Sequence, residues 1–188
     1  MSIPENELLL RIKRDPEAFA LLYDKYYNSI FGYVFRRTGQ YDLSRDITAE
    51  TFLRAYQKID LFEWRNISFS AWLYKIAGNE TNMYFRKSRY SPACLDDLKL
   101  TNQLFYEEGI ETERAALEKS LQENTAFHSV LEQLKGLGTK YQEVIALRFF
   151  EGKSIKQIAE ILGKNEGTIK SLLSRGLHKL RMALHEKS

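Results

Sequence analysis

Hydrophobic side chains recur at three- and four-residue steps along most of the chain, the spacing of an amphipathic helix. The first long stripe follows Asp15-Pro16, where a capping acid precedes proline at the first helical position. The spacing predicts a long helix that ends near Thr38-Gly39. Its apolar positions are Phe19, Leu22, Tyr23, Tyr26, Tyr27, Ile30, Phe31, Val34 and Phe35.

Two more apolar stripes complete an N-terminal group of helices. A second helix is expected after Asp42, and a third begins at Phe69, beyond a break in the pattern at 62–68. Together with a short helix before Lys13, they predict a compact helical bundle over residues 8–90. The second stripe holds Leu43, Ile47, Phe52, Leu53, Tyr56 and Ile59, and the third holds Phe69, Trp72, Leu73, Ile76, Ala77, Tyr84 and Phe85.

The rest of the chain predicts a second small bundle. Ser91-Pro92 ends the first bundle, and residues 91–112 lack sustained periodicity, so they are interpreted as an acidic linker. Helical spacing returns near Glu113 and continues through 113–188. No strand pattern of convincing length and no internal repeat occurs. The predicted fold class is all-α, with two small helical bundles joined by a flexible linker.

Two short helical patterns within the second bundle flank Gly163-Lys164-Asn165. The first has one apolar face, formed by Ile155, Ile158, Ala159 and Leu162. Gly163 can adopt the left-handed conformation that ends a helix, and Asn165 can cap the next one. Helix, short glycine-containing turn and helix is the layout of a DNA-binding helix-turn-helix, although an ordinary helical hairpin shares it. The second helix has a hydrophilic face that could reach phosphates and base edges: Thr168, Lys170, Ser171, Ser174, Arg175 and His178.

Charge is distributed unevenly along a chain whose formal net charge is only +3. Residues 1–90 hold 14 basic and 11 acidic side chains, residues 91–138 hold 4 and 9, and residues 139–188 hold 10 and 5. The two ends therefore attract phosphate and the middle repels it, as expected for two DNA-compatible domains joined by an acidic connector.

Cysteine content and hydropathy indicate a cytoplasmic protein. Cys94 is the single cysteine, so no intrachain disulfide can form. No apolar run approaches membrane-spanning length, and the first residues lack the basic-then-apolar pattern of a signal peptide.

Metal and catalytic chemistry find little support in the sequence. His178 and His185 lie seven positions apart without a zinc-site framework of cysteines or carboxylates, so we expect neither a metal nor a cofactor. Asp42, Asp46 and Glu50 recur every four residues and share one helical face. They could be ligands of a Mg²⁺-dependent nuclease, a solvated acidic face, or a docking surface for a basic partner. No glycine-rich phosphate loop or Ser/His/Asp set is present, so we expect no catalytic residue.

The third predicted helix mixes aromatic, amide and basic residues. Such a mixture suits single-stranded nucleic acid, because bases stack on rings while cations hold the backbone. Trp72 and Tyr84 are equally compatible with a place in the core, since they are in helical phase with Phe69. The residues in question are Trp72, Tyr74, Lys75, Asn79, Asn82, Tyr84, Arg86, Lys87 and Arg89.

Segments on both sides of the linker together resemble one family. Phe19–Tyr23, Asp46–Tyr56 and Phe69–Ala77 resemble the second conserved domain of the extracytoplasmic-function (ECF) sigma factors. Tyr141–Arg181, which includes Arg148-Phe149-Phe150-Glu151-Gly152 and Glu166-Gly167-Thr168-Ile169-Lys170-Ser171, resembles their fourth domain. A helix-turn-helix alone is shared by many regulators, whereas this pair of motifs in this order is specific.

The resemblance implies a dissociable specificity subunit of bacterial RNA polymerase, with core polymerase, promoter DNA and an anti-sigma factor as partners. It assigns Asp46 and Glu50 to core-polymerase binding. The residues implied at the melted minus-ten element are Trp72, Tyr74, Asn79, Asn82, Arg86 and Lys87. Those implied at the minus-thirty-five element are Asn165, Thr168, Lys170, Ser171 and Arg175.

The chain departs from the family pattern at five positions. Ala49 stands where the acidic motif usually has Gln, Gly78 replaces Arg, Met83 replaces Asp, Leu172 replaces Arg, and Gly176 stands where Ala is common. Two other functions stay open at this point. One is a conventional DNA-binding regulator that acts as a dimer without polymerase, and the other is the metal-dependent nuclease.

Overall fold

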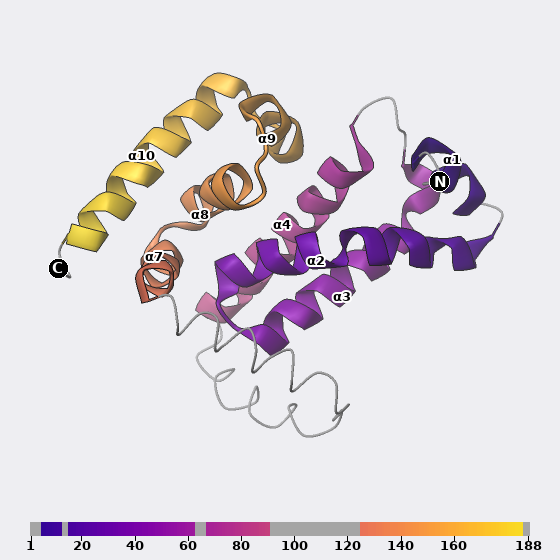
Figure 1. The fold of residues 1–188 in the computed structure, drawn as a ribbon, viewed down its shortest axis with the longest axis horizontal. Helices are drawn as coiled ribbons and strands as arrows, with labels where there is room; N and C mark the ends of the chain where they lie inside the picture. Colours follow the sequence, from indigo (N-terminus) through magenta and orange to yellow (C-terminus); the bar gives the residue numbers. More distant parts are fainter. Residues whose placement is uncertain (1–4, 13–14, 63–66, 91–124, 186–188) are drawn as a thin grey trace.

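Helices make up all the regular structure in the part of the chain that the computed structural model describes, which is residues 5–12, 15–62, 67–90 and 125–185 (Figure 1). The predicted linker lies outside these residues, as does the first part of the helix expected from Glu113, whose last part is described as Thr125–Gly136. We refer to residues 5–90 as the N-terminal half and to residues 125–185 as the C-terminal half.

The N-terminal half is a bundle in which α2, α3 and α4 pack against one another. Leu22, Ile30 and Val34 of α2 are fully buried, as are Phe69 and Leu73 of α4, so the predicted apolar stripes form the core. The elements are α1 (Glu5–Ile12), η1 (Pro16–Ala18), α2 (Phe19–Thr38), α3 (Tyr41–Gln57), η2 (Ile59–Leu61) and α4 (Phe69–Tyr90).

Local signals place the C-terminal end of α2 where the sequence predicts it, whereas the helix begins three residues after Pro16. Asp15 accepts a hydrogen bond from the Glu17 N–H at 3.2 Å, although the turn it caps is 3-10 and α2 proper begins at Phe19. Gly39 ends the helix in the left-handed conformation, with φ of 66°. A glycine carries no steric penalty there.

One part of the predicted core stripe of α3 is wrong. Leu53 is 51% exposed and Tyr56 is 41% exposed, whereas Phe52 and Ala55 are buried. The helical phase explains the difference, because positions 53 and 56 follow Asp46 at steps of seven and ten and therefore lie on its solvent-facing side.

The C-terminal half contains the predicted helix pair and one element that the sequence did not indicate. The chain leaves α8 through a π-helical turn in which the Glu151 N–H donates to the Ala146 carbonyl at 3.1 Å. Such turns redirect a helix and are frequent at functional sites. The elements are α7 (Thr125–Gly136), α8 (Thr139–Ile145), η4 (Ala146–Phe150), α9 (Ile155–Leu162) and α10 (Glu166–His185).

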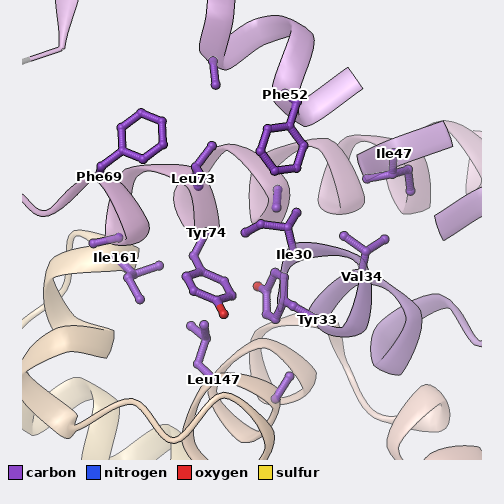
Figure 2. Close-up of a cluster of buried hydrophobic side chains, with 14 of the residues drawn as sticks. Ile30, Tyr33, Val34, Ile47, Phe52, Phe69, Leu73, Tyr74, Leu147 and Ile161 are labelled. Carbon is purple, nitrogen blue, oxygen red and sulfur yellow. The ribbon is translucent and has the colours of Figure 1, made fainter. Parts of the chain in front are cut away.

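The two bundles pack against each other and share one buried hydrophobic cluster. Ile161 of the C-terminal half lies on the Phe69 side of α4 and Leu147 lies near the Tyr74 ring, whereas Leu73 points to the other side of α4, toward Phe52 (Figure 2). Helix α4 contacts α9, and α2 contacts α7 and η4. The all-α, two-bundle prediction is confirmed. The sequence did not predict this closed arrangement, in which the apolar surface of α9 and η4 is covered by the N-terminal half.

Candidate nucleic-acid interfaces

The helix-turn-helix of α9 and α10 is held by local caps. The Ser154 hydroxyl accepts from the Gln157 N–H at 3.2 Å, and the Gln157 side chain accepts from the Ser154 N–H at 2.8 Å, which closes a capping box. Gly163 ends α9 with φ of 61°. The Asn165 side chain accepts from the Thr168 N–H at 2.7 Å and so caps α10. Both turn residues act as the sequence predicts.

The hydrophilic face of α10 is open to solvent. Thr168, Lys170 and Arg175 are exposed, and Ser171 is half-buried and accepts a hydrogen bond from Arg175 at 2.9 Å. Leu172 is half-buried against the hydrophobic cluster, so its side chain is used for packing. Helix α10 can therefore present its first turns to a DNA groove while its apolar side holds the bundle together.

The predicted single-strand residues of α4 fall into two groups. Asn79, Arg86 and Lys87 are exposed. Trp72 is half-buried, with its ring centroid 4.9 Å from that of Phe62. Tyr74 is only 2% exposed, so its ring is not accessible to a base in this arrangement.

Glutamates of the C-terminal half cover Tyr74 and the half-buried Asn82. Glu151, directly after η4, accepts hydrogen bonds from the Tyr74 hydroxyl at 2.6 Å and from Arg36 at 2.7 Å. Glu143 of α8 accepts a long hydrogen bond, 3.4 Å, from the Asn82 amide. Sequence reasoning missed these contacts, because nothing near either glutamate in the chain indicates its partners.

Arg37 lies at the centre of the same region and has a fully buried side chain. Its guanidinium donates to the Asn82 side-chain oxygen at 2.6 Å and to the Tyr33 hydroxyl at 3.1 Å, and it lies 3.8 Å from the Glu143 carboxylate. We call Arg36, Arg37, Tyr74, Asn82, Glu143 and Glu151 the arginine–glutamate cluster.

Burial dominates the electrostatics of this cluster. Burial raises the pKa of Tyr33, and the Arg37 charge only partly opposes it. Burial and the adjacent Glu151 carboxylate raise the pKa of Tyr74. Both phenols therefore stay protonated and can donate hydrogen bonds. Burial also lowers the pKa of Lys153, whose ammonium lies 4.7 Å from the centre of the Tyr74 ring.

The predicted acidic face of α3 is partly free. Asp46 is exposed, and partial burial raises the pKa of its carboxyl, with Arg45 opposing the rise. Glu50 accepts a hydrogen bond from Arg54 at 2.6 Å, and Arg54 also pairs with the buried Glu80 at 3.2 Å. Beside Asp46, the exposed Leu53 and Tyr56 add an apolar component.

Two structural observations bear on the remaining alternatives. Among the described residues, no group of three His, Cys, Asp or Glu side chains is placed to hold a metal ion. None of the described helices is long and apolar enough to cross a bilayer.

Both halves match models of one protein family. Residues 22–90 match Sigma-70 region 2, and residues 127–180 match Sigma-70, region 4. The chain is 34% identical over 180 residues to the ECF RNA polymerase sigma factor SigW of Bacillus subtilis, which covers 93% of this chain and 92% of SigW. It is also 34% identical over 170 residues to the ECF RNA polymerase sigma factor BldN of Streptomyces coelicolor, which covers 90% of this chain and 61% of BldN.

A solved structure shares the fold. The sigma factor RpoE of Bartonella quintana, in complex with the anti-sigma factor NepR, aligns with a TM-score of 0.62 at 22% identity. The alignment covers 89% of this chain and 96% of that one.

Proposed function

The chain belongs to the ECF sigma factors of bacterial RNA polymerase, and we propose that it divides promoter-specific initiation among three of its surfaces. The observation that carries this division is that one chain has a reading helix with an open polar face and a second helix lined with amides and cations. A duplex and a separated strand require these two different kinds of surface.

The first surface is the open face of α10, which we assign to the minus-thirty-five element. Thr168, Lys170, Ser171 and Arg175 lie on its early turns, where a recognition helix meets base edges in the major groove. The Asn165 side chain is occupied by its cap, so Asn165 contributes by fixing the helix start. The N–H groups at that end can hold a phosphate.

The second surface is α4, which we assign to the melted minus-ten element. Asn79, Arg86 and Lys87 are available in the closed arrangement. Tyr74 and Asn82 complete the surface once the C-terminal half moves away. Trp72 lies on the same helix, half-buried against Phe62 of its own half. Each base that stacks on an aromatic ring contributes ~1–3 kcal/mol, which offsets part of the cost of separating the strands.

The third surface is the acidic side of α3, which we assign to core polymerase. Asp46 is the carboxylate with most freedom to meet a basic partner, while Glu50 is shared with Arg54. Leu53 and Tyr56 would bury apolar area next to these charges. Charge complementarity then sets the orientation, and apolar burial adds affinity.

On this account the chemistry belongs to the polymerase, and the chain itself has no catalytic activity. Because its proposed partner is RNA polymerase, we assign the chain to the cytoplasm. An anti-sigma factor, such as the partner of the Bartonella protein, would regulate it by covering the same surfaces.

Reconstitution tests the assignment. The purified chain and bacterial core polymerase should start transcripts at a defined set of promoters that the core enzyme alone does not select. Transcription without promoter selectivity would contradict the function. A palindromic footprint made by the chain without polymerase would favour the dimeric regulator instead.

The division of labour has its own test. Reversing both charges, with Asp46→Lys and Glu50→Lys, should weaken polymerase association while leaving the affinity for minus-thirty-five duplex unchanged. Glu17→Lys combined with Asp24→Lys makes the same change of net charge at exposed positions of η1 and α2 and should have little effect on either. Equal loss of polymerase and DNA binding in the double variant would refute the assignment.

A further inference from the structure

The arginine–glutamate cluster has an asymmetric composition. The N-terminal half supplies the donors, which are the guanidinium groups of Arg36 and Arg37, the Tyr74 hydroxyl and the Asn82 amide. The C-terminal half supplies both carboxylates, from Glu143 and Glu151, and also places the Lys153 ammonium over the Tyr74 ring. Separating the halves would therefore leave a group of cations and hydrogen-bond donors on the face shared by α2 and α4.

Such a group of donors suits a phosphodiester as well as a carboxylate. Guanidinium forks bind carboxylate and phosphate oxygens through the same geometry. Asn82 and Tyr74 belong to the surface that the proposed function assigns to the melted strand, and both arginines contact the same glutamates as these two residues. The arginines thus extend that surface onto the end of α2.

The glutamates satisfy this group incompletely. The Arg37 Nε is buried and has no hydrogen-bond partner. Glu143 remains 3.8 Å from the Arg37 guanidinium, beyond hydrogen-bonding distance. A buried donor without a partner destabilises the closed arrangement. The Glu143 carboxylate is therefore an imperfect ligand for this site, and an anion of different shape could bind there better.

Gly78 leaves space for the Glu143 carboxylate. A Cβ at this position would lie 2.8 Å from the Glu143 carboxylate and 3.3 Å from the Tyr33 hydroxyl. Any other residue would force the carboxylate to shift. The bare backbone of α4 therefore forms part of the site.

We propose that Arg36 and Arg37 belong to the surface that holds the melted promoter strand, and that Glu143 and Glu151 occupy it in the closed arrangement as substitutes for its phosphates. The chain thereby inhibits its own binding of single-stranded DNA. The inference rests on the strand-holding role proposed for α4 and adds two residues and an internal competitor to it.

The test measures binding of a fluorescent single-stranded minus-ten oligonucleotide to the full chain by anisotropy at low salt. Glu143→Gln combined with Glu151→Gln should tighten binding by about tenfold, because uncompensated buried arginines favour opening. Glu132→Gln combined with Glu160→Gln removes the same charge from exposed positions and is the matched control. It accounts for the general effect of net charge on DNA affinity.

A second pair of substitutions tests the arginines directly. Adding Arg36→Gln and Arg37→Gln to the Glu143/Glu151 variant should abolish the gain, with circular dichroism verifying that the helices are retained. Binding no tighter than that of the control variant would overturn the inference, as would a gain that survives without the arginines. Either result, obtained with a chain that still directs promoter-specific transcription, leaves the proposed function intact.

Discussion

The two proposed DNA surfaces differ in how they are built and in how accessible they are. The face of α10 is fixed by caps within its own segment and is open to solvent. The face of α4 is partly covered, and its Tyr74 and Asn82 are bound to glutamates of the other half. If the proposed roles hold, this arrangement presents the recognition helix to duplex DNA and covers part of the surface proposed for the separated strand.

This difference suits the order of events at a promoter. A duplex must be located before its strands separate, so an exposed strand-binding surface would serve no purpose earlier and could bind other nucleic acids. The ion pairs set how the two halves are oriented on each other, whereas the contacts of Leu147 and Ile161 bury apolar surface between them. The closed arrangement is therefore a state that polymerase and promoter together would open.

The largest expected effect compares one arginine from each surface. Arg37→Ala should lower the free energy of unfolding by ~3–5 kcal/mol, because it breaks a buried charged network. Arg175→Ala, at an exposed position, should change it by about 0.5 kcal/mol or less. Urea denaturation followed by circular dichroism measures both. Similar losses would mean that the two surfaces do not differ in the way described.

The next prediction concerns DNA binding, where we expect Arg175 to matter although it matters little for stability. Arg175→Ala should weaken binding of the reconstituted polymerase to its minus-thirty-five element by ~1–3 kcal/mol, the contribution of one good base contact. Arg181→Ala, an exposed arginine two turns further along α10, is the control. Competition binding with matched and scrambled elements measures the change. If both substitutions reduce affinity equally for both sequences, α10 contributes charge alone.

A smaller effect isolates a single contact between the halves. Tyr74→Phe removes the hydroxyl that donates to Glu151 and should cost about 1.5 kcal/mol, since the acceptor is charged. Tyr56→Phe removes an exposed hydroxyl and should cost almost nothing. Thermal or urea unfolding of both variants measures the two changes in stability. Equal stability of the two would show that the Tyr74–Glu151 bond does not stabilise the closed arrangement.

The smallest net effect on stability is expected at Gly78, where two contributions to the free energy of unfolding oppose each other. Gly78→Ala gains ~0.8–1.0 kcal/mol of helix propensity in α4, but its Cβ displaces the Glu143 carboxylate. We expect little net change in stability together with tighter binding of single-stranded DNA. The full helical gain with unchanged DNA binding would mean that Glu143 moves aside without consequence. Ser88→Ala, at an exposed position of α4 that is assigned to none of the three surfaces, serves as the control.

The same contrast explains how much could be predicted from the sequence. Gly163 and Asn165 were identified correctly because a cap depends on residues within about four positions. The closed arrangement was not predicted, since its contacts join residues 61, 77 and 115 positions apart. The acidic face of α3 was predicted only in part. Its carboxylates were recognised, whereas the exposure of Leu53 depends on which side of the helix the bundle buries.

One distance tests the central claim that the covered face of α4 must open. Spin labels at two exposed positions, Lys58 of the N-terminal half and Lys179 of α10, would report it in a chain with Cys94→Ser. Pulsed electron paramagnetic resonance should give one short distance for the free chain. A clearly longer distance is expected when the chain is bound to core polymerase on a melted promoter. An unchanged distance in a complex that starts transcription would contradict the account.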